Sequence, residues 1–302
     1  MIDVKVEKDI WYNYMSDKMK VVIYGAGGTG RRLCKQLYDR YEVIAFMDTD
    51  KRKQNTIIDG IPCISEKEIK ELSYDKIVIG AASGYSEIVE KLHDLGVSDS
   101  VIDRSFVGAR VEARRMFLER YAEICDFLNN PRVAVAEAGV FRGEFAKDIN
   151  RVFRQNDIFL YDTFEGFCAA DIDDNELKSD IYNSNEEMQG QFAETSENYV
   201  LARMPYKERC HIRKGVFPSS FKEHDLQFGF VSLDMDLYKP MKAGLEMFYP
   251  RMIEGGVILV DDYFTPGHPM VPNAIADFEK ETNIKLKYIP IGDGVGVAVI
   301  KN

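Results

Sequence analysis

Apolar runs and glycine-containing turns follow one another in two separate stretches of the chain, and both stretches predict strand, turn, helix and strand. The first is KVVIYGAGGTGRRLCKQLYDRYEVIAFMD over residues 20–48, and the second is VAVAEAGVFRGEFAKDINRVFRQNDIFLYD over residues 133–162. The β-branched run before the turn favours a buried strand, and helical spacing of apolar residues after it favours an amphipathic helix. Parallel strands need such a crossover, so each stretch predicts the opening βαβ unit of a doubly wound sheet.

Weaker patterns complete each unit. Before residue 110 the chain predicts a turn-rich stretch, a helix near 66–72, a strand in KIVIGAAS and a helix near 87–95. After residue 162 it predicts an acidic loop or lid over 169–199, then strands in FGFVSLDMD, GGVILVDDY and GVGVAVIK. The predicted fold class is α/β, with two Rossmann-like doubly wound sheets, of which the N-terminal one is small.

The segment between the two units, VEARRMFLERYAEICDFLNN over residues 111–130, predicts an amphipathic helix that ends near Asn129 and Pro131. We expect its apolar side to pack on the second unit, and a freely exposed linker helix is the alternative. A chain of 302 residues is long for a single core. The expected domains are residues 1–109, a connector helix over 110–130, and residues 131–302.

Composition narrows the class of protein. The hydrophobic fraction is 45%, charged residues make up 29%, and the formal net charge of -11 argues against nucleic acid as a partner. Five widely spread cysteines show no metal-ligand spacing and predict reduced thiols in a cytoplasmic protein. No apolar stretch reaches the roughly 18 to 20 residues of a membrane span. We therefore expect a protein without a membrane span, acting as a homo-oligomer.

Gly25, Gly27 and Gly30 form the pattern GxGxxG between the first predicted strand and its helix, and Asp48 ends the next strand. The missing side chains let a pyrophosphate approach the free amides and the positive dipole end of the helix. Asp48 can accept hydrogen bonds from ribose hydroxyls. The turn predicts a nucleotide site, and a tight turn without any ligand is the alternative.

The pieces VVIYGAGGTGRRL, VIAFMDTD and DGIPCI lie within about residues 20–103. They resemble the small Rossmann domains at the front of bacterial polysaccharide-biosynthesis proteins, including sugar acyltransferases and sugar-nucleotide epimerases. In those families the domain binds a nucleotide or nucleotide-sugar, or serves as a docking module. The resemblance implies a nucleotide-sugar as the ligand of this glycine turn.

The second turn is sparser in glycine, with Glu137, Gly139 and Gly143 in EAGVFRG and Asp162 at the end of the next strand. Glycine admits a ligand close to the backbone, and the N-terminus of the following helix can face a carboxylate. Asp162 can accept hydrogen bonds from both hydroxyls of a ribose. The alternative is that Glu137 caps a helix and Asp162 a turn.

Four aspartates lie where two predicted strands end: Asp234 and Asp236 near the end of FGFVSLDMD, and Asp261 and Asp262 after VILV. Side chains two apart in an extended segment point to one side, and open α/β sheets bind ligands at this edge. Four carboxylates there repel one another unless a cation intervenes. Ligation by oxygen alone, with no thiolate or imidazole in the set, indicates Mg²⁺ before Mn²⁺ or Ca²⁺. Capping of helices and turns is the alternative role.

Several motifs recur in order over about residues 131–300: AEAGVFRGEFA, YDTFEGF, KGVFPSSF, SLDMDLYKPMKAGLEMFYPRMIEGGVILVDDY and NAIADF. Together they resemble the macrocin O-methyltransferase family, class I enzymes that methylate sugar hydroxyls with S-adenosylmethionine. The resemblance implies cofactor contacts from Glu137, Gly139, Gly143, Asp162 and Thr163, with Lys214 and Gly215 near the adenine. It also implies a Mg²⁺ site made by Asp234, Asp261 and Asp262, and Asp236 as the general base for the hydroxyl proton.

Two further residues are candidate substrate contacts. His268 lies in PGHPMVPNAIADF, where the chain departs from the family pattern of a glycine followed by a basic residue, and Tyr238 lies beside the first acids. An exposed loop residue and a core aromatic are the alternatives.

The expected activity is metal-dependent methylation of a sugar or nucleotide-sugar hydroxyl in bacterial polysaccharide or glycoside biosynthesis. One alternative is an NAD-dependent oxidoreductase that uses the first glycine turn. The other is a nucleotide-sugar binding scaffold whose methyltransferase domain is inactive.

Overall fold

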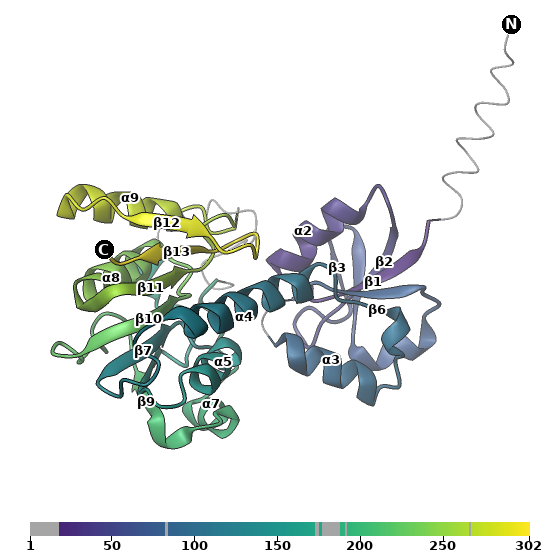
Figure 1. Cartoon of the computed structure of the whole chain (residues 1–302). Helices are drawn as coiled ribbons and strands as arrows, with labels where there is room; N and C mark the ends of the chain where they lie inside the picture. The colour runs from purple at the N-terminus through teal and green to yellow at the C-terminus, as the bar shows by residue number, and fades with distance from the viewer. Residues whose placement is uncertain (1–17, 82–83, 173–174, 177–187, 191, 266) are drawn as a thin grey trace, which may run out of the picture. The chain divides into compact units, whose positions relative to one another are not determined.

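The computed structural model describes residues 18–81, 84–172, 175–176, 188–190, 192–265 and 267–302. The chain divides into two compact units, Met1–Ala109 and Arg110–Asn302. Each unit is built on one sheet of mostly parallel strands, as Figure 1 shows. The predicted fold class is confirmed. Much of the predicted acidic lid falls on residues 173–174, 177–187 and 191, which lie outside the described residues.

The first unit has a six-stranded sheet in the order β3-β4-β2-β1-β5-β6. Its strands are β1 (Lys20–Tyr24), β2 (Glu42–Met47), β3 (Thr56–Ile58), β4 (Ile61–Ile64), β5 (Lys76–Ile79) and β6 (Ile102–Asp103). Its helices are α2 (Gly28–Leu37) and α3 (Tyr85–Asp94), with short 3₁₀ turns at Glu66–Glu71 and Asp99–Val101. Because β1 pairs in parallel with both β2 and β5, the strand order reverses where β1 ends, and the first glycine turn lies at this point.

The second unit has a seven-stranded sheet in the order β12-β13-β11-β10-β7-β8-β9. Its strands are β7 (Val133–Ala138), β8 (Ile158–Asp162), β9 (Cys210–Lys214), β10 (Gln227–Leu233), β11 (Met252–Val260), β12 (Lys287–Pro290) and β13 (Val297–Ile300). β13 runs antiparallel to both of its neighbours, β11 and β12. β7 pairs in parallel with β8 and β10. The second glycine turn therefore lies at the reversal of this sheet, where open α/β sheets bind ligands.

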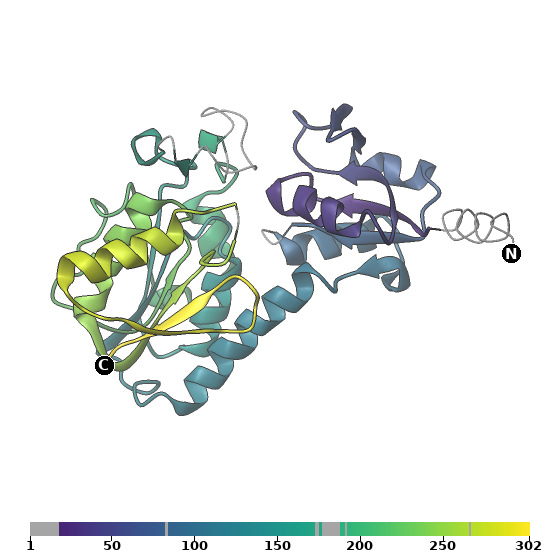
Figure 2. The same ribbon diagram turned by 90° about the horizontal axis from the view of Figure 1, so that it is seen from above.

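Helices cover both faces of the second sheet. They are α4 (Val107–Ile124), α5 (Glu144–Val152), α7 (Glu197–Arg203), α8 (Tyr238–Phe248) and α9 (Val271–Thr282). One core cluster joins α8 and α9 to one sheet face, and a second joins α4, α5 and α7 to the other. Figure 2 shows α9 and α4 on opposite sides of the strands. No helix among the described residues is long and apolar enough to cross a bilayer.

The connector helix α4 differs from its expected form. It ends at Ile124, and Met116 and Ile124 are exposed rather than buried. The buried side is set by Leu118 and Tyr121, whose hydroxyl donates hydrogen bonds to two backbone carbonyls of the sheet. Phe117 and Cys125 also pack against the core of this unit, so the expected packing of the helix holds apart from Met116 and Ile124.

A close backbone approach in the second unit lies at Gly139, where β7 meets β10. Its φ is +86°, and a Cβ there would lie 1.7 Å from the carbonyl oxygen of Asp234. Gly255 offers a matched comparison, because its φ of +73° is also left-handed but nothing lies within 4 Å of a Cβ there. At Gly139, both the lack of space for a side chain and the left-handed backbone require glycine. At Gly255, only the backbone conformation favours it.

We expect Gly139→Ala to destabilise the second unit by about 2–5 kcal/mol, since both left-handed strain and overlap oppose the new methyl group. Gly255→Ala should cost only about 1–2 kcal/mol. Differential scanning calorimetry of the two variants without ligand measures the difference. Equal losses in both would contradict the close approach at Gly139.

Candidate active site

The first glycine turn is closed by the acid that ends β2. The Gly25 amide donates to the Met47 carbonyl at 2.7 Å, and the Asp48 carboxylate accepts from the Ala26 amide at 2.8 Å. A Cβ on Gly30 would lie 1.8 Å from the Gly25 carbonyl oxygen, so Gly30 lets α2 pack on the turn.

Gly27 plays a different part in the same turn. It is the N-cap of α2, and nothing lies within 4 Å of a Cβ placed there. The open space adjoins the free amides of a helix N-terminus, which attract anions. The predicted nucleotide contacts of this turn stay predictions.

The second turn repeats the arrangement. The Gly139 amide donates to the Tyr161 carbonyl at 2.9 Å, and one Asp162 oxygen accepts from the amides of Val140 and Phe141 at 2.7 and 2.8 Å. Gly143 is the N-cap of α5, with a left-handed φ of +73°. In both units, a carboxylate thus accepts hydrogen bonds from backbone amides of the glycine turn.

The side chains of Asp162 and Thr163 form hydrogen bonds with the protein backbone. The second Asp162 oxygen accepts from the Phe164 amide at 2.6 Å, and the Thr163 hydroxyl donates to the Gly166 carbonyl at 2.6 Å. Asp162 therefore orders the turn first, and a ribose could use only its remaining lone pairs. The cofactor role of both residues stays a prediction.

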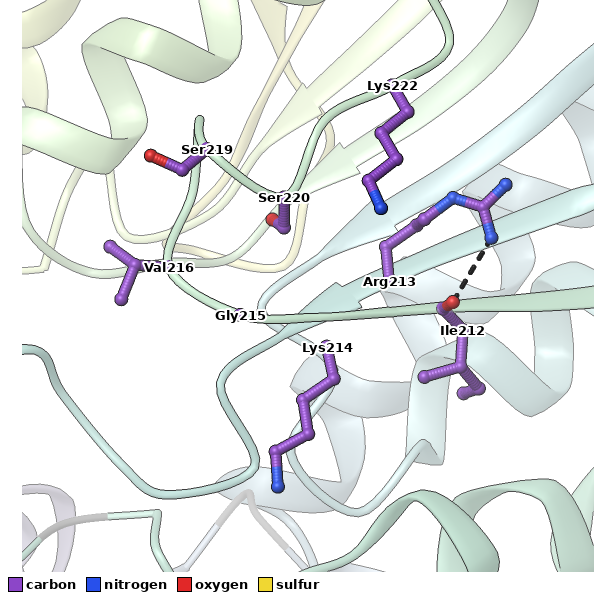
Figure 3. Close-up of a pocket in the computed structure, with 8 residues that line it drawn as sticks. All are labelled: Ile212, Arg213, Lys214, Gly215, Val216, Ser219, Ser220 and Lys222. Carbon is purple, nitrogen blue, oxygen red and sulfur yellow. Dashed lines mark hydrogen bonds between the residues drawn. The ribbon is translucent and has the colours of Figure 1, made fainter.

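A pocket of about 510 Å³ opens beside the end of β9, and Lys214 and Gly215 both line it, as Figure 3 shows. The Lys222 side chain extends toward β9 in this view, and Lys214 extends away from it. Lys214 pairs with Glu165 at 3.0 Å. The two residues expected near adenine thus border one hollow, next to the loop that follows β8.

The acidic cluster forms where β10 and β11 end. Asp234 and Asp236 follow β10, and Asp261 and Asp262 follow β11. Carboxylate oxygens of Asp234, Asp261 and Asp262 lie within 4.8 Å of one another. The structure brings together the four acids that the sequence singled out.

His268 joins this cluster. Its Nε2 lies 3.9 Å from an Asp236 oxygen and 3.7 Å from an Asp262 oxygen, and the residue is 7% exposed. The expectation that no imidazole belongs to the set is therefore wrong. His268 is only six residues from Asp262, but the local sequence does not show that its ring turns toward the acids. A second set of possible metal ligands is Asp236, Asp262 and His268.

Both Asp236 and Asp262 have left-handed backbones, with φ of +62° and +56°. Aspartate and asparagine tolerate this conformation better than most residues. The sharp turns direct both side chains back to the strand ends, and the two residues are buried. Burial and the neighbouring Asp262 raise the pKa of Asp236 well above its usual range.

Two arginines of α4, which the sequence reading missed, enter the cluster. Arg114 Nη1 lies 2.9 Å from Asp261 and 3.2 Å from Asp234. Arg110 Nη2 lies 3.5 Å from Asp261 and 3.4 Å from Asp262. The available signal was their spacing of four residues, which places both on one face of a helix.

Arg114 also reaches into the sheet. Its Nη2 donates to Ser232 Oγ at 3.1 Å, and its guanidinium carbon lies 4.3 Å from the centre of the Phe145 ring. Ser232 pairs in register with Glu137 across β10 and β7. The two residues form a polar notch on the sheet face that α4 covers.

Glu137 lies in this notch rather than at the surface. It is 2% exposed, and its Oε2 has no hydrogen-bond partner among the described residues. Burial raises the pKa of Glu137 well above its usual range, and Arg114 opposes that shift. The expected cofactor contact is therefore a carboxyl buried directly beneath the turn.

The pKa values of Asp261 and Asp234 are shifted in opposite directions. Asp261 has a pKa lowered below its usual range because Arg114 and Arg110 together outweigh burial, whereas burial and Asp261 raise the pKa of Asp234. Arg114 also interacts electrostatically with Glu137 and Asp293.

Asp234, Asp261 and Asp262 each offer a carboxylate oxygen within 4.8 Å of the others. Asp261 Oδ1 is buried without a partner among the described residues. This set of close oxygen atoms fits a divalent cation.

Tyr238, the other candidate substrate contact, is the first residue of α8. Its hydroxyl donates to Asp277 of α9 at 2.7 Å, and this hydrogen bond raises the pKa of Tyr238 to about 12. Its backbone amide donates to Glu176 at 2.7 Å. The hydroxyl thus joins two helices, and contact with a substrate stays a prediction.

Two family models match the chain. The C2185-like N-terminal model matches residues 17–102, and the macrocin-O-methyltransferase (TylF) model matches residues 114–300. The first match names neither acyltransferases nor epimerases, so that part of the N-terminal resemblance stays a prediction. No curated protein matches the chain.

Solved structures resemble parts of the chain. The O-methyltransferase NovP is 21% identical over 63% of this chain and 80% of its own, with a TM-score of 0.49. The calicheamicin methyltransferase CalS11 is 19% identical over 72% of this chain and 85% of its own, with a TM-score of 0.49. UDP-D-quinovosamine 4-dehydrogenase from Vibrio fischeri is 31% identical over 27% of this chain and 75% of its own, with a TM-score of 0.24.

Near the pocket beside β9, Glu223 is a buried acid held by its neighbours. Burial alone would raise the pKa of Glu223, but hydrogen bonds from Tyr161 at 2.6 Å, from the Lys222 amide at 3.0 Å and from Arg213 at 2.6 Å outweigh it and lower that pKa. A lowered carboxyl pKa contributes stability above the unfolded pKa, and this is lost as pH falls through the folded value.

We expect Glu223→Gln to lower the free energy of unfolding by about 1.5–3 kcal/mol at pH 7, because charged hydrogen bonds are lost. The difference from wild type should shrink below about pH 4, where the wild-type carboxyl is protonated as well. Urea denaturation at several pH values measures it. Glu112→Gln, at an exposed side chain of α4, is the control, and a pH-independent difference would contradict the assignment.

Proposed function

The chain belongs to the macrocin O-methyltransferase family, and from this premise we propose that it transfers a methyl group from S-adenosylmethionine to a sugar hydroxyl in bacterial polysaccharide or glycoside biosynthesis. The C-terminal resemblance seen in the sequence is confirmed, and the protein is an O-methyltransferase. The nature of the acceptor and the need for a divalent cation belong to the proposal.

One observation carries the proposal: the glycine turn and the acidic cluster are in direct contact. The backbone of Gly139 touches the Asp234 carbonyl, and the Asp234 amide donates to the Ala138 carbonyl at 2.8 Å. A methyl donor bound at this turn would therefore lie beside the acids. Proximity of this kind supplies much of what an in-line transfer requires.

The residues of the cluster would have different roles in the reaction. Asp234, Asp261 and Asp262 would hold a divalent cation, which when bound polarises a hydroxyl oxygen and favours loss of its proton. Asp236 would accept that proton, and its raised pKa suits a general base better than that of an ordinary exposed aspartate. His268, within 4 Å of Asp236, would orient it or contact the sugar.

The first unit would bind a nucleotide or nucleotide-sugar through Gly25, Gly27, Gly30 and Asp48. The open space at Gly27 and the helix N-terminus beside it support this part. All five cysteines are free, which fits a reducing compartment such as the cytoplasm.

Asp236→Asn should lower the rate of methyl transfer by about 100- to 10,000-fold, because the amide cannot take a proton. Asparagine tolerates the left-handed backbone, so S-adenosylhomocysteine should still bind. Transfer of labelled methyl groups and calorimetric binding together measure the two effects. Asp225→Asn, at an exposed residue of the loop before β10, is the control. Full activity of Asp236→Asn would remove Asp236 from the role of base.

The two turn acids provide a matched pair in the full-length chain. Asp162→Asn should weaken S-adenosylhomocysteine binding about tenfold, because an amide nitrogen would face backbone donors that now meet a carboxylate. Asp48→Asn should leave that affinity unchanged and weaken binding of a nucleotide-sugar. Isothermal titration calorimetry with S-adenosylhomocysteine, NAD and a nucleoside diphosphate sugar measures all three. Tight NAD binding without S-adenosylhomocysteine binding would favour the oxidoreductase instead.

A further inference from the structure

The two arginines of α4 contact the acids expected to bind metal, but they are held very differently. Arg114 makes close contacts with Asp261 and Asp234, donates to Ser232 and stacks on the Phe145 ring. Its side chain is 12% exposed. These contacts come from β10, the end of β11 and helix α5, so Arg114 is fixed in place.

Arg110 is held more loosely. Among the described residues it contacts Asp261 at 3.5 Å and Asp262 at 3.4 Å, and both distances exceed the 2.7–2.9 Å typical of a hydrogen bond between an arginine and a carboxylate. Its side chain is 18% exposed, against 12% for Arg114. Arg110 is therefore the less firmly held of the two arginines.

Both acids that Arg110 touches belong to the three-carboxylate set. A divalent cation and a guanidinium group attracted to the same two carboxylates repel each other, and this repulsion is strong where the site is shielded from water. Of the two guanidinium groups that contact these acids, a cation would displace the less firmly held one. The geometry identifies that group as Arg110.

We propose that Arg110 is an internal competitor of the divalent cation. It neutralises Asp261 and Asp262 in the metal-free protein and leaves them when the cation binds. Arg114 remains, and as a positioning residue it keeps Asp234 and Asp261 together. The inference rests on the proposed function, since it concerns the metal proposed there.

The test is a titration of the full-length protein with MnCl₂ alone, without cofactor, in an isothermal titration calorimeter. Removing the competitor in Arg110→Gln should tighten Mn²⁺ binding by about tenfold, equivalent to about 1.4 kcal/mol. Arg120→Gln is the matched control, because Arg120 lies on the same helix but pairs with Glu123 in solvent. Its Mn²⁺ affinity should equal that of wild type. Unchanged or weaker binding in Arg110→Gln would overturn the proposal.

Removal of Arg110 also leaves two buried acids without their partner, so folding of the variant is followed by circular dichroism. The proposal requires MnCl₂ to raise the melting temperature of Arg110→Gln more than that of wild type, and to restore the fold if the variant is unfolded without metal. A variant that MnCl₂ fails to stabilise would count against the proposal.

Binding of S-adenosylhomocysteine to the same samples distinguishes a failure of the Arg110 competition from a failure of the proposed function. If it binds but no variant binds Mn²⁺, the competition is wrong and methyl transfer without a metal remains open to measurement in the presence of a chelator. If Mn²⁺ binding tightens as expected but S-adenosylhomocysteine does not bind, the proposed function fails alone.

Discussion

Charge balance at the ends of β7, β10 and β11 constrains the rest of the second unit. Asp234, Asp236, Asp261 and Asp262 lie together there, and burying acids in one place is unfavourable unless positive charge is brought to them. Arg114 brings part of that positive charge from α4, which explains why this helix carries a buried arginine. The polar pair Glu137 and Ser232 lies beneath it on an otherwise apolar face.

The glycine turns of the two units have the same backbone arrangement. In both, the acid ending the second strand receives amides of the glycine turn, and a neighbouring strand lies close against that turn. The residue whose amide meets the first strand is Asp234 in the second unit but Gly80 in the first. The first unit thus has the same turn without an acid at that position.

Much of the fold could be predicted because each βαβ unit has a local sequence pattern: an apolar run, a turn and a helical period. The strands β3, β4, β6, β9 and β12 were not predicted. They are short, all but β4 lie at sheet edges, and they are poor in alternating pattern, so pairing with a neighbouring strand decides them. Phe117 and Tyr121 of α4 pack on the second unit as expected, whereas Met116 and Ile124 are exposed.

The sequence by itself determined the two doubly wound units, the glycine turns and the four aspartates at strand ends, because these follow from chain-local chemistry and from the rule that parallel strands end at one edge. Only the tertiary structure decided what surrounds the acids. Arg110 and Arg114 lie more than one hundred residues from their partners, and His268 returns on a loop. Such contacts have no local signal, since they depend on how separate elements pack, and they set the charge of the site.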